Sequence, residues 1–450
     1  MKLHEKIKVH IISLGCSKNL VDSEVMGGLL SQSGLQLVNR RELADIVIVN
    51  TCAFINPAKE EAVEEILQLA WGKKEGLHPF RIVVAGCLAQ RYGRELLAEI
   101  PEVDLFIGTG EVANIVQHLD RMISTEAKRL AVITKPNFLM NSKHPRVLSG
   151  ASVTAYLKIS DGCSNCCTYC VIPSLRGRAR SRKPDDILQE AQMLAQRGIR
   201  EIIITGQDTT AYGMDLKGHP RLADLLTDLA AIRGIQWIRL LYAHPAHLKE
   251  EMMISMAGSK KICRYIDFPI QHIDDAILKA MNRNVTSHRI KEIISGARAM
   301  MPDIALRTSI IVGFPGETPK RFDRLLDFIG EAKFDHLGVF PYSREEGTQA
   351  ALLPSRIAEK EKQRRRDIIM NQQAAISNRI NHGLIDTIQE ILIEGKSDRS
   401  DYIYVGRCRR QAPEIDGITY VKGKQAKTGS IIQGKIVAAD DYDLFAEIIE

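Results

Sequence analysis

Long apolar runs, aromatic side chains and a strong excess of one charge are all scarce in this sequence of 450 residues. No apolar run approaches the ~18 residues that a membrane-spanning helix requires, so we expect no such helix. The 61 basic and 55 acidic side chains leave a net charge of +6, too small to indicate a nucleic-acid-binding protein by itself. Hydrophobic residues make up 45% and charged residues 26%, which excludes disordered and collagen-like chains and favours several globular domains.

The first residues do not have the pattern of a secretion signal. Lys6, Lys8 and His10 interrupt the apolar residues before Cys16, so the hydrophobic segment of a signal peptide is missing. We therefore expect a cytoplasmic protein. In that reducing compartment, nine cysteines indicate metal binding or catalysis before disulfides.

Residues 1–123 alternate between short apolar runs and helix-like segments. This alternation predicts an α/β domain, in which a parallel sheet carries helices on its faces. The expected strands are Val9–Leu14, Ile46–Asn50, Ile82–Ala85 and Leu105–Ile107, and the expected helices include Pro57–Trp71 and Glu111–Met122. Residues 124–150 lose the pattern and contain two prolines, which predicts a linker.

The alternation resumes over residues 151–383 and runs longer. Six strand–helix units in about 200 residues predict a parallel (β/α) barrel, complete or partial. The expected strands are Tyr156–Ile159, Glu201–Thr205, Trp237–Tyr242, Tyr265–Pro269, Ala305–Val312 and His336–Phe340. The expected helices are Pro184–Gln196, Arg221–Ile232, Asp274–Met281, Arg289–Met300, Lys320–Ala332 and the long charged segment Ser355–Asn381.

Residues 384–450 differ from the rest of the chain in their short apolar alternations, which glycines interrupt. Such spacing predicts a small antiparallel β-barrel. The expected strands are Thr387–Ile393, Tyr402–Val405, Ile418–Val421, Ser430–Val437 and Leu444–Ile449.

Three cysteines, Cys163, Cys167 and Cys170, form the pattern C-x3-C-x2-C directly after a predicted strand. Three thiolates can hold three irons of a 4Fe–4S cluster, and the fourth iron then stays open to a small molecule. Zinc is the competing interpretation, because Cys166 creates two adjoining C-x2-C pairs. Four zinc ligands within eight residues fit the usual spacing of zinc sites poorly, although Cys166 stands where it could compete as a ligand.

Cys16, Cys52 and Cys87 each follow the carboxyl end of a predicted parallel strand. Because those ends line one crevice of an open α/β sheet, the three thiols are expected to form a second metal site. The alternative is three small buried residues, since a free cysteine also behaves as a core hydrophobe.

The cysteine loop, with Tyr169 before its third cysteine, resembles the signature of radical S-adenosylmethionine (SAM) enzymes. The whole arrangement, with the three-cysteine N-terminal domain and a C-terminal barrel of the TRAM type, resembles the radical SAM methylthiotransferases. That resemblance implies two 4Fe–4S clusters, one on Cys16, Cys52 and Cys87 for sulfur delivery and one on Cys163, Cys167 and Cys170 for radical generation. It also implies that one SAM supplies a methyl group, that a second SAM supplies the radical, and that a flavodoxin or ferredoxin supplies electrons.

The resemblance further implies a set of side chains that contact SAM. These are Tyr169, Gly206, Gln207, Asp208, Gln271, Arg307 and Ser309. From the residues alone, Gly206–Asp208 follows a strand at the end where barrels bind ligands, and it fits a polar turn equally well. His244 and His247 have no further ligand nearby in the sequence and are interpreted as structural. The basic cluster Arg176, Arg178, Arg180, Arg182 and Lys183 could orient a carboxylate or simply face solvent.

Two substrates divide the family that the chain resembles: a tRNA adenosine and an aspartate β-carbon of small-subunit ribosomal protein S-twelve. The segments Lys158–Cys163, Ile172–Gly177 and Ala412–Gly417 resemble the ribosomal-protein branch. Residues 384–450 hold nine basic and twelve acidic residues, whereas a module that grips RNA would need a basic stripe. An acidic module suits a basic protein partner, so a nucleic-acid partner is left open but not favoured. Another class of protein, a non-catalytic iron–sulfur protein that binds RNA or ribosomes, is the remaining rival.

Overall fold

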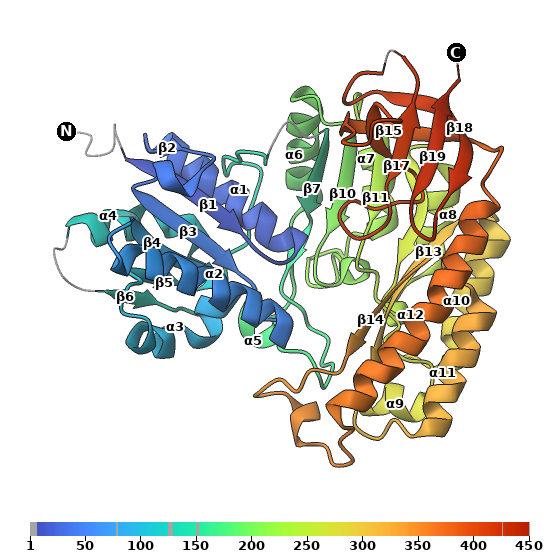
Figure 1. The fold of residues 1–450 in the computed structure, drawn as a ribbon, viewed down its shortest axis with the longest axis horizontal. Helices are drawn as coiled ribbons and strands as arrows, with labels where there is room; N and C mark the ends of the chain where they lie inside the picture. Colours follow the sequence, from blue (N-terminus) through green and yellow to red (C-terminus); the bar gives the residue numbers. More distant parts are fainter. Residues whose placement is uncertain (1–6, 78–79, 125–128, 150–152, 425, 450) are drawn as a thin grey trace.

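The computed structural model describes residues 7–77, 80–124, 129–149, 153–424 and 426–449. An N-terminal α/β domain lies beside a central helix-covered sheet, and a small C-terminal β-barrel packs against that sheet (Figure 1). Among the described residues, every helix is too short or too polar to span a lipid bilayer.

The N-terminal domain contains a six-stranded parallel sheet of order β2-β1-β3-β4-β5-β6. Its strands are β1 (Lys8–Ser13), β2 (Gln36–Leu37), β3 (Ile46–Thr51), β4 (Arg81–Gly86), β5 (Leu105–Ile107) and β6 (Leu130–Val132). Its helices are α1 (Ser17–Gln32), α2 (Asn56–Lys74), α3 (Cys87–Glu99) and α4 (Ile115–Ser124). The central strand β3 is buried along its whole length, as its uninterrupted apolar run requires in a sheet covered on both faces.

Two strands of this sheet were not predicted. β2 has two residues, too few to show any alternation, and it pairs only with β1 at the sheet edge. β6 lies within the segment 124–150 that the sequence predicts to be a linker, and it completes the other edge by pairing with β5. The predicted boundary at residues 150 and 151 lies outside the described residues.

All six strands expected in the central region are present and parallel, in the order β14-β13-β12-β11-β10-β7. They are β7 (Thr154–Lys158), β10 (Glu201–Thr205), β11 (Trp237–Leu240), β12 (Ile262–Asp267), β13 (Ala305–Val312) and β14 (His336–Pro341). Because β7 and β14 do not pair, this is a partial barrel with an open side. A short ladder of β8 (Ser160–Asp161) and β9 (Arg180–Ser181) and the helix α5 (Ile172–Arg176) surround the cysteine loop.

Helices cover the convex face of this partial barrel. They are α6 (Pro184–Gln196), α7 (Leu222–Ala231), α8 (Glu250–Gly258), α9 (Asp275–Ala280), α10 (Ser287–Met300), α11 (Pro319–Ala332) and α12 (Glu359–His382). The residues at the N-termini of several of these helices favour helix initiation. Pro184 and Pro319 occupy the first helical positions of α6 and α11, and the side chain of Asp274 accepts hydrogen bonds from backbone N–H groups in the first turn of α9.

The C-terminal region is a closed five-stranded barrel of order β15-β16-β17-β19-β18. Its strands are β15 (Ile388–Lys396), β16 (Tyr404–Cys408), β17 (Thr419–Lys422), β18 (Ile431–Ala439) and β19 (Leu444–Ile448). The predicted barrel is confirmed, but it is not wholly antiparallel, since β17 and β19 pair in parallel. The crossover through β18 brings β19 back in the same direction as β17 and closes the barrel.

The concave face of the partial barrel is filled by the two other domains. One continuous apolar cluster joins Trp237 and Tyr265 of the sheet to Val21 of α1 on one side and to Leu392 of the C-terminal barrel on the other. A closed (β/α) barrel fills its interior with its own side chains. Here the open side leaves room for α1, and this insertion carries the N-terminal thiols to the barrel mouth.

Candidate metal and cofactor site

Cys16, Cys52 and Cys87 lie at the carboxyl ends of the adjacent strands β1, β3 and β4. Cys16 directly precedes α1, and Cys87 is the first residue of α3. The turn before Cys16 is tight, because Gly15 has a φ of +89° and a Cβ there would lie 2.6 Å from the Cβ of Cys52. The strand order therefore brings the three thiols close enough to interact, and a metal site on them stays a prediction.

Asn19 connects the three strand ends to one another. Its amide nitrogen donates to the carbonyls of Leu14 at 3.0 Å and Thr51 at 2.9 Å. Its amide oxygen lies 4.0 Å from the sulfur of Cys87. A single side chain of α1 thus contacts the segments that carry the three cysteines, which fixes their relative positions.

Opposing effects act on the three thiols. Burial, with the neighbouring Cys87 and Cys16, raises the pKa of Cys52 to about 12. Burial likewise raises the pKa of Cys87, although Arg176 opposes the shift. For Cys16 burial is outweighed by the cations of Lys18 and Arg176, so its pKa lies below the usual value. Burial therefore favours the protonated thiols of Cys52 and Cys87, and a metal that binds them must displace their protons.

Cys163, Cys167 and Cys170 follow β8 in one loop. Within it the backbone N–H of Cys170 donates to the carbonyl of Cys167 at 3.1 Å. Two donors approach the sulfurs themselves: the backbone N–H of Ile172 lies 3.4 Å from Cys170, and the Arg283 guanidinium lies 3.7 Å from Cys167. Donors aimed at cysteine sulfurs are one means by which proteins tune iron–sulfur clusters.

The cysteine that departs from the pattern, Cys166, is exposed and its thiol contacts only the carbonyl of Ser164 at 3.8 Å. The other three sulfurs interact with one another, and burial raises the pKa of Cys163 to about 11 and that of Cys170 to about 12. This arrangement favours three ligands over the four that the zinc interpretation needs. Both three-thiol sets fit an iron–sulfur cluster by their donor chemistry.

Gly206, Gln207 and Asp208 follow β10 at the barrel mouth, beside the cysteine loop. A Cβ on Gly206 would lie 2.6 Å from the hydroxyl of Ser160, so the turn requires glycine. The amide nitrogen of Gln207 donates to Asp161 at 3.1 Å, while its buried amide oxygen has no hydrogen-bond partner. A buried acceptor without a donor is costly, and it marks this turn as a place where a ligand fits.

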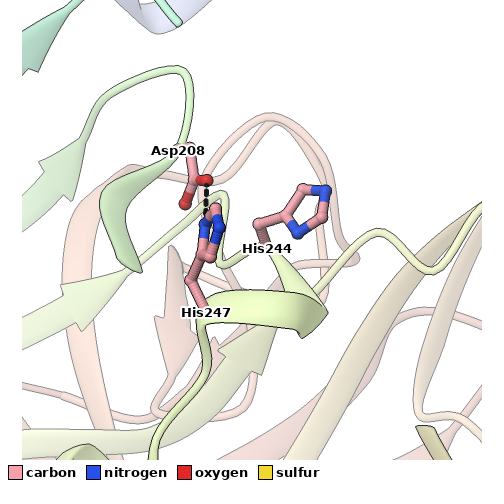
Figure 2. A group of neighbouring side chains, drawn as sticks. All are labelled: Asp208, His244 and His247. Atoms are coloured by element: carbon pink, nitrogen blue, oxygen red, sulfur yellow. Dashed lines mark hydrogen bonds and ion pairs between the residues drawn. The ribbon is translucent and has the colours of Figure 1, made fainter. Parts of the chain in front are cut away.

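Asp208 lies next to His244 and His247, and Figure 2 shows the three side chains together. A carboxylate oxygen of Asp208 is 2.7 Å from Nδ1 of His247 and accepts a second hydrogen bond of 2.7 Å from Asn165. The interpretation that the two histidines have no further ligand nearby is therefore wrong, because β10 and β11 are adjacent and their ends meet. Although burial raises the pKa of Asp208, the hydrogen bond from His247 and the electrostatic effect of the nearby His244 outweigh burial and keep that pKa below its usual value.

The remaining residues predicted to contact SAM lie in the cysteine loop (Tyr169), after the end of β12 (Gln271) and on β13 (Arg307 and Ser309). Gln271 has a φ of +70° and exchanges backbone hydrogen bonds with Ser309 and Ile311. The Tyr169 hydroxyl is 3.4 Å from Arg283. Arg307 lies 3.1 Å from Asp416 of the C-terminal barrel, so its side chain is used at a domain boundary. Contact of these residues with SAM stays a prediction.

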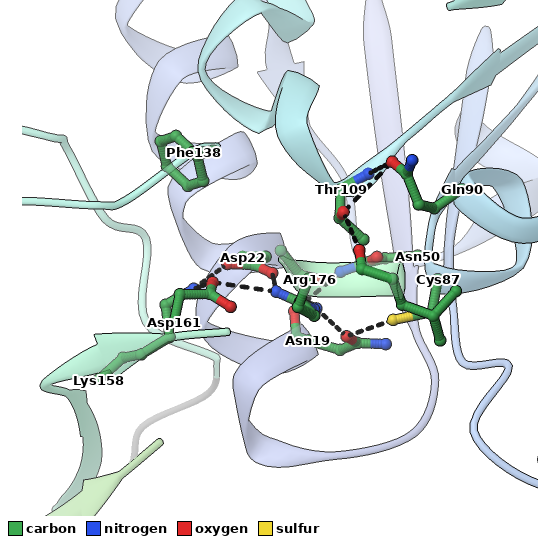
Figure 3. A network of polar contacts seen from close by, with 12 residues as sticks. Asn19, Asp22, Asn50, Cys87, Gln90, Thr109, Phe138, Lys158, Asp161 and Arg176 are labelled. Carbon is green, nitrogen blue, oxygen red and sulfur yellow. Dashed lines mark hydrogen bonds and ion pairs between the residues drawn. The ribbon is translucent and has the colours of Figure 1, made fainter. Parts of the chain in front are cut away.

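The basic cluster divides into two groups. Arg176 and Arg182 are buried in ion pairs, whereas Arg178 and Lys183 are exposed. Arg176 lies 2.6 Å from Asp22 of α1 and 3.2 Å from Asp161, and Lys158 pairs with the same two carboxylates (Figure 3). The cluster thus includes a buried network that fastens the N-terminal domain to the cysteine loop. The sequence did not reveal it, because its members are far apart in the chain.

The first turn of α1 also enters the barrel mouth. The hydroxyl of Ser17 is 3.0 Å from that of Thr205 at the end of β10. The ammonium of Lys18 lies 3.3 Å from the ring centre of Tyr242, which follows β11. Active sites of (β/α) barrels lie at these carboxyl strand ends. The first turn of α1, which follows Cys16, and the cysteine loop therefore both lie at the mouth of the partial barrel.

Comparisons with known protein families agree with the division of the chain into three domains. Residues 8–108 match the uncharacterized protein family UPF0004, residues 157–329 match the radical SAM superfamily, and residues 386–449 match the TRAM domain. A solved radical SAM methyltransferase, TsrM of Kitasatospora setae, shares the fold with a TM-score of 0.56 at 14% identity, over 86% of this chain and 81% of its own. The chain is a radical SAM enzyme, and an iron–sulfur cluster and SAM are its cofactors.

Full-length relatives narrow the class. The ribosomal protein uS12 methylthiotransferase RimO of Syntrophus aciditrophicus is 55% identical over 98% of both chains, and that of Geobacter sulfurreducens is 48% identical over 99% of both. This chain belongs to the family of ribosomal protein uS12 methylthiotransferases. The predicted resemblance, and its ribosomal-protein branch, are confirmed.

Proposed function

We propose that this protein attaches a methylthio group to the β-carbon of an aspartate of ribosomal protein uS12. The observation that carries the proposal is identity of 55% and 48% to uS12 methylthiotransferases over nearly the whole of each chain. The site supports the same proposal, because the helix that follows Cys16 reaches the barrel mouth where the cysteine loop lies. A methylthio transfer needs both a radical source and a sulfur source within reach of one substrate carbon.

Cys163, Cys167 and Cys170 would hold one 4Fe–4S cluster, and Cys16, Cys52 and Cys87 would hold a second. When bound, the clusters and SAM supply a carbon-centred radical, a methyl group and sulfur. The chain's own residues then have definite tasks. Gly206 and Gln207 offer SAM a narrow turn and an unpaired acceptor, and Asn19 holds the second set of thiols in place.

The proposed division of labour follows the predicted parts of the chain. Residues 1–123 together with β6 deliver sulfur, residues 151–383 generate the radical, and residues 384–450 hold the substrate, with the rest of 124–150 connecting the first two. The excess of acidic residues in the last part supports a basic protein partner. A low-potential donor of the ferredoxin or flavodoxin class would reduce the clusters, and a ribosomal-protein substrate places the reaction in the cytoplasm.

Paired mass analysis of cells with and without the gene tests the proposal. We would weigh the small-subunit ribosomal proteins intact and digest total tRNA to nucleosides. Loss of one methylthio group from uS12 alone is expected, and fragmentation would then locate the aspartate. Loss from a tRNA adenosine would keep the chemistry and replace the substrate. No change in either mass would contradict sulfur transfer and favour a non-catalytic role.

A further inference from the structure

Lys18 differs from every other buried cation among the described residues. The residue is only 7% exposed, and its ammonium interacts with Tyr242 and with the thiol of Cys16, but no carboxylate or carbonyl oxygen among the described residues accepts a hydrogen bond from it. The ring of Tyr242 is its close neighbour, at 3.3 Å. The other buried lysine and arginine side chains each donate to a carboxylate or carbonyl: Lys158, Arg176, Arg182, Arg239, Arg283, Arg365 and Arg407.

A buried cation without a carboxylate partner is expensive to maintain, and the one thiol beside Lys18, that of Cys16, is itself a proposed cluster ligand. Such a cation therefore indicates the place of a charged ligand. An aromatic ring offers an ammonium only part of what it loses on leaving water. The backbone of Tyr242 has a φ of +62°, a conformation that non-glycine residues adopt at a cost and that is concentrated at functional sites. Both observations place the ligand at the end of β11.

A second unsatisfied group lies next to Tyr242. Asp267, at the end of β12, accepts the backbone N–H of Tyr242 through one carboxylate oxygen at 3.1 Å. Its other oxygen is buried without a hydrogen-bond partner and is 3.7 Å from Arg307. The end of β11 thus offers a cation without a carboxylate partner together with an acceptor oxygen that receives no hydrogen bond. An aspartate within a polypeptide offers the complementary pair, a carboxylate and a backbone N–H.

We propose that Lys18 binds the side-chain carboxylate of the aspartate that the enzyme modifies. This inference rests on the proposed function and assigns it a substrate-binding residue. Lys18 follows Cys16 by two residues on the helix that enters the barrel mouth, so the carboxylate would be held between the two sets of thiols. The β-carbon is bonded directly to that carboxylate carbon, and fixing one therefore fixes the other. An adenosine has no carboxylate, so the contact would also select a protein over a tRNA.

A binding experiment that crosses enzyme and substrate variants tests the proposal. The anaerobically purified protein with its clusters would be titrated, without reductant, with labelled uS12 carrying either the modified aspartate or asparagine at that position. For the natural protein we expect the asparagine form to bind about 10-fold or more weakly, the size of a hydrogen bond between charged groups. For Lys18→Met both forms should bind within about 2-fold of each other, since the cation that distinguishes them is gone.

Matched controls separate this role from others. Lys74→Met removes an equal charge from an exposed site on α2 and should keep the full preference for aspartate. Lys18→Arg retains a cation at this position and should therefore keep part of the preference for aspartate over asparagine. Iron content and circular dichroism check folding, and Lys18→Gln replaces Lys18→Met if the latter fails to assemble.

Three results would overturn the inference. One is an undiminished preference for aspartate in Lys18→Met. Another is equal weakening of both uS12 forms together with a shifted cluster potential, which would assign Lys18 to the cluster. A third is a loss of SAM affinity, which would assign it to the cofactor. Failure of the proposed function is distinct, because the natural protein would then leave uS12 unmodified in the mass analysis.

Discussion

Cys163, Cys167 and Cys170 occupy one loop of the central domain, whereas Cys16, Cys52 and Cys87 come from three separate strand ends of the N-terminal sheet. The first set is close in space because it is close in sequence. The second set is assembled by the strand order β1-β3-β4 and by the side chain of Asn19. One site is thus a local property of the chain, and the other depends on the tertiary fold of a whole domain.

Replacing single cysteines by alanine is the strongest test of this comparison. We expect Cys163→Ala, Cys167→Ala or Cys170→Ala to abolish cleavage of SAM, because each removes a ligand of the radical-forming site. Cys16→Ala or Cys87→Ala should retain cleavage and stop sulfur insertion. Chromatography of 5′-deoxyadenosine and mass analysis of uS12 measure the two steps separately. If all variants lost both steps alike, the two sites would not be functionally separate.

A matched pair of glycine variants disturbs each site through the backbone instead of the ligands. In Gly15→Ala the new Cβ would lie 2.6 Å from the Cβ of Cys52, and in Gly162→Ala it would lie 2.2 Å from the carbonyl oxygen of Arg178. Both positions also have a positive φ. Each variant should lose about four of its iron atoms, the content of one cluster. Only Gly162→Ala should lose SAM cleavage, and an unchanged iron content in either variant would contradict the assigned strain.

Arg176→Met tests the buried ion pairs that connect the N-terminal domain to the loop of Cys163, Cys167 and Cys170. It leaves Asp22 and Asp161 buried with Lys158 as their remaining cation, a change that costs about 3–5 kcal/mol in buried ion pairs. The midpoint of urea denaturation should fall markedly. Arg178→Met, its exposed neighbour, is the control and should change the midpoint little. Equal effects of the two variants would show that the buried network contributes no stability.

Glu201→Gln, at the contact between the partial barrel and the C-terminal barrel, is expected to reduce stability by less than Arg176→Met. Glu201 lies 2.5 Å from Arg407 and 2.8 Å from Arg239. Because both arginines keep other hydrogen-bond acceptors, we expect the free energy of unfolding to fall by about 1–3 kcal/mol.

The stabilisation that Glu201 provides should depend on pH. Although burial raises the pKa of Glu201, the two arginines outweigh it and lower the pKa from 4.5 to about 2. The stabilisation is therefore complete above pH 4.5 and is lost as the pH falls toward 2. Glu201→Gln should be less sensitive to acid than the natural protein over this interval. Denaturation midpoints measured from pH 6 to pH 3 would contradict the prediction if the two proteins lost stability in parallel.

The sequence predicted most of the fold because many of the parallel strands in both α/β regions contain continuous apolar runs, as at Ile46–Val49 of β3. It missed β2, which has only two residues, and β6, which lies among prolines at a sheet edge. It could not foresee that β17 and β19 pair in parallel. Strand pairing depends on the path of the connections, which short alternations do not reveal.

The positions of both sets of cysteines after strands could be predicted from the sequence, because the residue that follows an apolar run can be read directly from the chain. That they hold clusters stays a prediction. The groups around the cysteines could not be predicted in the same way. Asp208 meets His247, and Lys18 meets Tyr242, through contacts between strands or domains that no spacing records. The basic cluster was predicted as one unit, yet burial separates Arg176 from Arg178. Charge alone does not tell which arginine faces the interior.

The apolar cluster that runs from α1 through the concave sheet to the C-terminal barrel also bears on protein engineering. The chain matches three separate domain families, but its three domains share this apolar core and therefore cannot be separated without exposing it. A central domain produced alone would expose Trp237 and Tyr265 to water and should aggregate. Chimaeras that exchange end domains with the tRNA-modifying branch would have to transplant the facing residues of both partners.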